Sequence, residues 1–147
     1  MLKTLRRFIV ILCIFSTIFT QISCNNDDDD DNVNLDCESA ICTEILIRIM
    51  VSIKDQNQNP VMLDTYKVIN LENGEDITIS LTSSELSGLQ EFGQYPLIED
   101  GILGVNQELD VQFVGYVDDQ EVVRSNYTVS TDCCHVSLDA GNLELVF

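Results

Sequence analysis

The sequence has no tryptophan, only two prolines and seven glycines, a single histidine, and seven basic residues in 147. With 45% apolar residues, so little proline and glycine excludes a collagen-like or wholly disordered chain. Seven basic against 25 acidic side chains, a formal charge of −18, exclude nucleic-acid binding as a default, because that affinity comes chiefly from Lys and Arg at phosphates. Without tryptophan, a carbohydrate platform of stacked rings would have to use tyrosine. The composition predicts one compact, acidic domain.

The first 23 residues differ in composition from the rest. Lys3, Arg6 and Arg7 precede an apolar run over residues 8–19, which ends at Thr20 and Gln21. This order of charge and apolar character is typical of a secretory signal peptide. The run is shorter than the roughly 20 apolar residues that a membrane-spanning helix needs. We therefore expect residues 1–23 to direct export and to be removed.

The end of this segment reads Gln21-Ile22-Ser23-Cys24, which resembles the lipobox of bacterial lipoproteins, although Gln21 replaces the usual aliphatic residue. The resemblance implies that Cys24 is acylated and becomes the first mature residue, so that a lipid bilayer is one partner. The following Asn25, Asn26 and Asp27–Asp31 are similar to the start of many Bacteroidota lipoproteins. That similarity implies display on the outer face of the outer membrane. A soluble secreted protein with a cysteine near its cleavage site is the alternative.

Residues 24–35 contain almost nothing to bury, and five consecutive aspartates repel one another. We expect an extended, disordered tether here. At about 3.3–3.6 Å per residue it would reach roughly 35–40 Å. A calcium site is the alternative, but an uninterrupted Asp run lacks the spaced ligands and glycine turn of a defined calcium loop.

Residues 36–147 are predicted to form the folded domain, and alternating apolar residues predict its strands. The clearest strand is Glu44–Lys54, for which a buried helix is the alternative. Leu109–Val117 and Glu121–Ser130, joined at Asp118–Gln120, are predicted to form a hairpin. Cys134–Leu138 and Leu143–Phe147 are predicted to form a closing hairpin.

The middle of the domain is less regular. Residues 66–72 and 77–81 flank Asn73-Gly74, a dipeptide that favours a hairpin reversal. Residues 83–93 are predicted to hold a loop or one helical turn. Strands separated by turns, without amphipathic helices between them, favour a disulfide-stapled, all-β antiparallel sandwich of about seven strands.

The stretch Val51–Val61 resembles the first strand and turn of carboxypeptidase-regulatory-like and related Ig-like or transthyretin-like sandwiches. Gly93-Gln94-Tyr95 is similar to the later G-x-Y of the same domains, while Gln58 stands where they usually have glycine. The resemblance implies a module for adhesion, spacing or ligand binding, with no catalytic residues.

The cysteines carry most of the remaining chemistry. With Cys13 in the signal peptide and Cys24 acylated, four remain, and an even number in an exported domain predicts disulfides. The four are Cys37, Cys42, Cys133 and Cys134, and four cysteines can pair in three ways. The last two are adjacent in a predicted strand, where successive side chains point to opposite faces. We therefore expect two bridges that tie the Cys37/Cys42 segment to the Cys133/Cys134 strand.

Two sharper hypotheses compete for this cluster. Together with His135 the four cysteines could supply soft ligands to zinc, but adjacent cysteines do not make the usual C-x₂-C spacing, and an oxidising compartment favours disulfides. His135 could also activate a Cys or Ser nucleophile, although a lone histidine on a strand is more often a packed or solvated side chain. We expect no metal, no cofactor and no enzymatic activity.

A surface for a partner is predicted around the turn of the central hairpin. Tyr116 lies opposite the core set of its strand by parity, and Asp118 and Asp119 follow it. The sequence thus predicts a lipid-anchored envelope protein that binds a protein or glycan partner or plays a structural role. An accessory subunit of an outer-membrane complex for glycan or nutrient uptake is one alternative, and a hydrolase with a pair of carboxylates or His135 is another.

Overall fold

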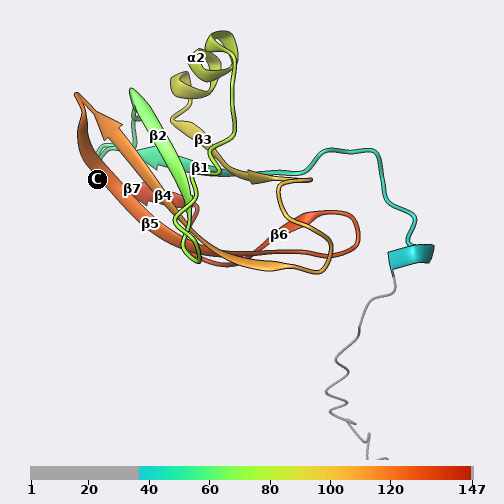
Figure 1. Ribbon diagram of the computed structural model, residues 1–147. Coiled ribbons are helices and arrows are strands. Elements are labelled where there is room, and N and C mark those ends of the chain that lie inside the picture. Colours follow the sequence, from blue (N-terminus) through green and yellow to red (C-terminus); the bar gives the residue numbers. More distant parts are fainter. Residues whose placement is uncertain (1–36, 147) are drawn as a thin grey trace, which may run out of the picture. The chain divides into compact units, whose positions relative to one another are not determined.

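The computed structural model describes residues 37–146, so Cys24, the predicted tether, Asp36 and Phe147 lie outside the described residues. The described part is all-β, with strands in two sheets (Figure 1). It also contains two disulfides, as the sequence predicts. The first sheet has the order β3-β1-β7 and the second the order β2-β4-β5-β6. The strands of the two sheets together are β1 (Arg48–Lys54), β2 (Thr65–Asn70), β3 (Gln94–Glu99), β4 (Glu108–Val117), β5 (Gln120–Thr131), β6 (Val136–Ala140) and β7 (Glu144–Val146). The helical elements are a single 3-10 turn, η1 (Cys37–Ser39), and α2 (Ser83–Glu91).

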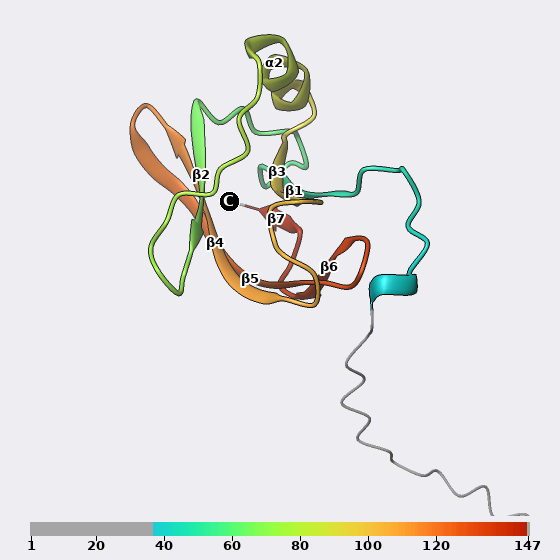
Figure 2. The ribbon, with the colours of Figure 1, turned by 45° about the vertical axis from the view of Figure 1, so that its right-hand side comes forward.

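The two sheets face each other and share one hydrophobic core (Figure 2). Every second residue of β1 is fully buried toward the end of the strand, as at Val51 and Ile53, and the same alternation buries Val111 and Phe113 in β4. The rings of Tyr66, Tyr95 and Phe113 pack together with centroids 5.5–6.2 Å apart. The apolar residues that define the strand pattern are therefore the ones that bind the sheets together.

The first predicted strand is shorter than its apolar pattern. β1 begins at Arg48, because its partner β3 ends at Glu99 and offers no further ladder positions. Ile47 is still held at this end, since its N–H donates to Asp100 Oδ2 at 2.8 Å and its carbonyl accepts from Asp100 N–H at 3.0 Å. Residues 44–47 are exposed or, at Ile47, borderline, and they stand outside the sheet.

The central hairpin is confirmed. β4 and β5 pair antiparallel over their lengths, and the reversal uses Asp118 and Asp119 at φ +50° and +60°. Aspartate tolerates this left-handed region better than most residues, which suits a two-residue hairpin turn.

The predicted closing hairpin is wrong. β6 pairs antiparallel with β5, whereas β7 crosses to the other sheet and pairs in parallel with β1. Ser52 N–H donates to Leu143 O at 2.7 Å at this crossing. An alternating pattern shows that a segment is a strand, but it does not select the neighbour, so the last strand adds one parallel pair to an otherwise antiparallel domain.

The middle of the domain keeps the reversal but not the second strand. Gly74 has φ +77°, and one isolated bridge joins Ile69 to Asp76. Residues 77–81 form no strand, and the Val68 N–H donates to the hydroxyl of Thr78 instead of to a backbone carbonyl. Residues 83–91 form a full helix, α2, begun by a capping box in which the Thr82 hydroxyl accepts from Glu85 N–H and the Glu85 carboxylate accepts from Thr82 N–H.

Candidate functional site

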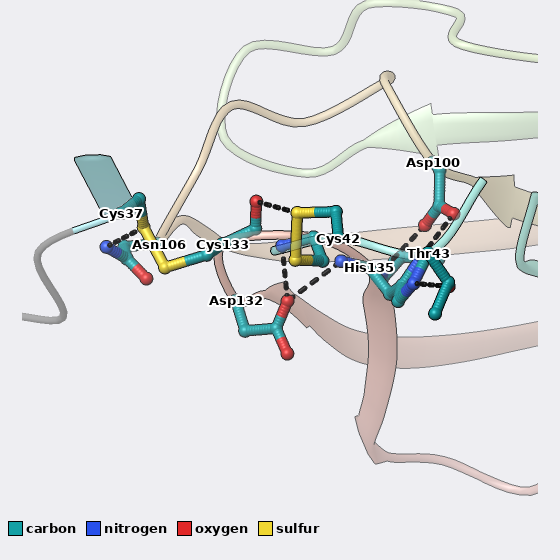
Figure 3. Close-up of a disulfide and its surroundings, with 10 residues drawn as sticks. Cys37, Cys42, Thr43, Asp100, Asn106, Asp132, Cys133 and His135 are labelled. Carbon is teal, nitrogen blue, oxygen red and sulfur yellow. Dashed lines mark hydrogen bonds and ion pairs between the residues drawn. A yellow bond between two sulfur atoms is a disulfide. The ribbon is translucent and has the colours of Figure 1, made fainter. Parts of the chain in front are cut away.

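The four cysteines form two disulfides at one end of the domain. Cys37 bonds to Cys133 and Cys42 to Cys134, each pair with its Cα atoms 5.2 Å apart (Figure 3). The predicted tie between the two cysteine pairs is confirmed, and all four sulfurs are in disulfides, so they are not thiolate ligands for zinc. Within residues 37–146 there is also no group of three or more His, Cys, Asp or Glu side chains arranged to hold a metal ion.

Cys133 and Cys134 lie in a bend between β5 and β6 and not in a strand, which corrects the expectation from the sequence. The bend is organised by Asp132, whose Oδ1 accepts from the N–H groups of Cys134 at 2.6 Å and His135 at 2.8 Å. These two amide hydrogen bonds lower the pKa of the Asp132 carboxyl below its ordinary value, with His135 the larger contributor. The amides of Cys134 and His135 thus donate to the side chain of Asp132 and not to the carbonyls of a neighbouring strand, as the predicted strand would have required.

The two disulfides close a small covalent ring. It runs along the backbone from Cys37 to Cys42, crosses to Cys134, passes to Cys133 and returns to Cys37. Asn106 also reaches this ring, with its amide 3.4 Å from Cys37 Sγ (Figure 3). The chain before β1 is therefore fixed to the bend between β5 and β6, over 90 residues away in sequence.

Beside the ring, His135 joins a carboxylate to a hydroxyl. His135 Nδ1 lies 2.8 Å from Asp100 Oδ2, and His135 Nε2 lies 2.9 Å from Thr43 Oγ1 (Figure 3). Asp100 further accepts from the N–H of Val136 at 2.8 Å and, as described above, from that of Ile47. Thr43 lies in the segment before β1, Asp100 directly follows β3, and His135 directly precedes β6.

The Asp100 carboxyl is held in its ionised form. Partial burial raises the pKa of this carboxyl, but the hydrogen bonds from Ile47 N–H, His135 and Val136 N–H outweigh that effect and leave the pKa below its ordinary value. In the neutral form of the imidazole, Nδ1 carries the hydrogen that the Asp100 carboxylate accepts, and Nε2 is then an acceptor for the Thr43 hydroxyl. This is the same order of hydroxyl, imidazole and carboxylate that activates a nucleophile in many hydrolases.

His135 stands out in the sequence as its only histidine, but its contacts with Asp100 and Thr43 do not. Asp100 is 35 residues away and Thr43 is 92 residues away. No local pattern marks either residue. The cysteines were the only available signal, since a bridge from Cys42 to Cys134 brings Thr43 next to His135.

The predicted partner surface lies at the other end of β5. Tyr116 is half-buried, and Asp118 and Asp119 are exposed at the turn before Gln120, whereas the disulfides follow Thr131. Asp64 holds this turn, because its N–H donates to Tyr116 O at 2.9 Å and its carboxylate accepts from Asp118 N–H at 2.7 Å. The structure thus keeps these three residues together and separates them from His135 by the whole length of β5.

Comparison of this chain with family models, with curated proteins and with solved structures found no match to any of them. Among the helices of residues 37–146, none has the length and apolar character needed to traverse a bilayer.

Proposed function

We propose that this protein is a lipoprotein of the cell envelope, anchored in the outer membrane through acylated Cys24, and that its sandwich acts by binding or as a structural module. The observation that carries the proposal is the pairing of all four cysteines of the domain in two disulfides. Such bonds persist in oxidising compartments outside the cytoplasm. The signal-like residues 1–23 and the lipobox-like Gln21–Cys24 supply a route to that compartment.

The partner surface is assigned to the turn that carries Asp118 and Asp119, with Tyr116 beside it. Both aspartates are exposed, and the turn is fixed by Asp64. A preorganised polar turn next to a tyrosine suits a protein or glycan partner, because little conformational freedom is lost on contact. One such partner would be an outer-membrane complex for glycan or nutrient uptake, of which this protein would then be an accessory subunit.

The anchor is tested by labelling the expressing cells with a radioactive fatty acid. We expect label in the wild type and in Cys13→Ser, and none in Cys24→Ser, because only Cys24 follows the lipobox-like residues. Cys13→Ser is the matched control, since it removes the other cysteine of the N-terminal region. Protease treatment of intact cells then reports whether the domain faces outward. Wild-type protein without fatty acid would overturn the anchor.

The partner surface is tested with the purified domain on glycan arrays and by co-purification from envelopes. Tyr116→Ala and Asp118→Asn should lose the partner, while Asp139→Asn, an exposed carboxylate in β6, should retain it. Retention of the partner by all three variants would move the binding surface elsewhere.

A hydrolase is the second candidate, and the contact of Thr43, His135 and Asp100 favours it. In that case the Thr43 oxygen would attack an acyl carbon and pass its proton to His135 Nε2, and the leaving group would take that proton as its bond to the acyl carbon breaks. Water would then attack the ester formed on Thr43, with its proton passing through His135 Nε2 to the departing Thr43 oxygen. Activated esters provide the probe. Thr43→Ala and His135→Ala should both abolish turnover, and Thr43→Ser should retain it. Equal turnover in His135→Ala and the wild type would exclude this candidate.

A further inference from the structure

A short segment ahead of β1 carries several exposed apolar side chains. Ten large apolar side chains of residues 37–146 are exposed, and four of them fall within residues 41–47. Ile41 is 98% exposed, Ile45 67% and Leu46 60%. Single exposed apolar residues are ordinary on protein surfaces, whereas several within one short segment make that segment a candidate for contact with lipid or with another molecule. We call these three residues the aliphatic patch.

The segment that carries the patch is held at several points. Cys37 and Cys42 are bonded to the β5–β6 bend, Thr43 contacts His135, and the backbone of Ile47 is paired with Asp100. The patch residues lie between these fixed points. Ile41 lies between the two bonded cysteines, and Ile45 and Leu46 lie between the hydrogen-bonded Thr43 and Ile47, so the folded domain holds this segment in place with the three side chains exposed.

The position of the patch in the chain indicates what covers it. Ile41 is only four residues after Cys37, and 12 residues, Asn25–Asp36, separate Cys37 from Cys24. At about 3.3–3.6 Å per residue this stretch can span at most about 45 Å. An anchor at Cys24 would thus keep the patch within reach of the bilayer at all times, and tethering makes even a weak affinity effective.

From this placement we propose that the aliphatic patch of Ile41, Ile45 and Leu46 rests in the interfacial region of the bilayer that carries the anchor, so that the sandwich stands with its disulfide end on the membrane. This inference rests on the proposed lipid anchor. All three side chains expose more than half of their surface and Ile41 nearly all of it, so each would gain from leaving water. The lipid surface should be zwitterionic, since the chain after residue 23 carries four basic against 25 acidic residues and an anionic surface would repel it.

The absence of tryptophan allows a clean test. Tryptophan is introduced by Ile45→Trp in the patch and, as a matched control, by Phe92→Trp, because both positions are 67% exposed. Phe92 lies away from the patch. Its neighbour Gly93 accepts from Ile53 N–H near the C-terminal end of β1, whereas Ile47 directly precedes the N-terminal end of β1. The chain beginning at Cys24, isolated without acyl groups, is coupled through the Cys24 thiol to a maleimide lipid in phosphatidylcholine vesicles. Every variant is thereby tethered whether or not the natural protein is acylated.

We expect the indole of Ile45→Trp to shift its emission to shorter wavelength on coupling and to be quenched by brominated phosphatidylcholine, and that of Phe92→Trp to show neither change. Adding Ile41→Ser and Leu46→Ser to Ile45→Trp should reverse the shift. Replacing part of the phosphatidylcholine by phosphatidylglycerol should weaken the quenching at low salt, and added salt should restore it.

Unchanged emission of Ile45→Trp on the tethered domain would overturn the docking while leaving the anchor untouched. Shielding of Ile45→Trp in isolated envelopes but not on vesicles would assign the patch to a protein partner and would also overturn it. A natural protein without fatty acid, combined with quenching on maleimide vesicles, would instead count against the anchor alone.

Discussion

Gly93 lies directly against the backbone of Ile53: a Cβ at position 93 would stand 2.5 Å from the Ile53 carbonyl oxygen and 3.0 Å from Val61 N. The same carbonyl accepts from Val61 N–H, and the Gly93 carbonyl accepts from Ile53 N–H. Three backbone segments therefore meet at this point, between the end of β1, the loop after it and the start of β3. No side chain fits there.

Gly93→Ala should consequently lower the free energy of unfolding by more than the penalty for an alanine in the left-handed region alone. Gly74→Ala is the control, because Gly74 has φ +77° and nothing within 4 Å of an added Cβ, against φ +61° at Gly93. We expect Gly74→Ala to lower the free energy of unfolding by about 1–2 kcal/mol from the φ penalty, and Gly93→Ala to lower it clearly further. Urea unfolding of the two variants measures the difference, and equal losses would contradict the close approach at Gly93.

Removing the first of the two disulfides should lower the free energy of unfolding less than removing the second. Whichever bridge is present closes a loop of over 90 residues, worth about 4–5 kcal/mol in the chain-entropy model, and the other then closes only the small ring, worth about 2–3 kcal/mol. We expect Cys37→Ser/Cys133→Ser and Cys42→Ser/Cys134→Ser each to lose about 2–3 kcal/mol, and the fourfold variant about 7 kcal/mol. Urea unfolding without reductant checks this. Losses that simply add would show that the bridges act independently.

Asp100→Asn should make the domain less sensitive to acid. The carboxyl has its pKa below the ordinary 3.8 in the folded state, so its contribution is present above pH 3.8 and is lost as the pH falls through the folded value. The amide cannot accept from Ile47 N–H, His135 and Val136 N–H at once, so we expect a loss of about 1–3 kcal/mol at pH 7 that shrinks below pH 4. The free energy of unfolding, measured by urea at both pH values, should converge with the wild type in acid. Asp139→Asn is the control and should run parallel to the wild type.

Tyr66→Phe should stabilise the domain. Its hydroxyl is buried and has no hydrogen-bond partner among the described residues, whereas the Tyr127 hydroxyl donates to Asn142 O at 3.0 Å. We expect a gain of about 1 kcal/mol for Tyr66→Phe and a loss of about 1 kcal/mol for Tyr127→Phe. Thermal unfolding of the two variants gives the signs directly, and a loss in Tyr66→Phe would mean that its hydroxyl is satisfied in solution.

The same residue gives an alkaline test. Burial, with a smaller opposing effect of Arg48, raises the pKa of Tyr66 to about 12. The unfolded chain loses this proton first, so wild-type stability should fall as the pH rises from about 10 toward 12, and Tyr66→Phe should remove that part of the fall. Burial also raises the pKa of Tyr95 and Tyr127, so tyrosinate absorbance should show a larger late ionisation in the wild type than in Tyr66→Phe.

The parts of the fold that depend on neighbours in sequence were predictable. The β4–β5 hairpin follows from alternation on both sides of Asp118-Asp119. The adjacency of Cys133 and Cys134 predicted that they bond to the other two cysteines and not to each other, but it did not select which cysteine bonds to which. The helix α2 was also marked, since Thr82 and Glu85 form a capping box at its start, although the sequence analysis expected at most one turn there.

The parts that depend on distant partners were not predictable. Leu143 and Leu145 alternate equally well for a strand beside β6 or beside β1, and only the packed domain selects β1. In the candidate site, Asp100 and Thr43 meet His135 across 35 and 92 residues, and no spacing in the chain records that meeting. Pairing and site assembly are set by the tertiary fold, which a periodic pattern does not encode.

The covalent ring also determines how the domain bears tension. A force applied to the chain ahead of Cys37 acts on the Cys37–Cys133 bond before it acts on any strand. This bond transmits the force to the bend between β5 and β6. β1 is thus spared from being peeled off β3 one hydrogen bond at a time. Tension on the N-terminal segment would therefore load a sulfur–sulfur bond before it loads the hydrogen bonds between β1 and β3.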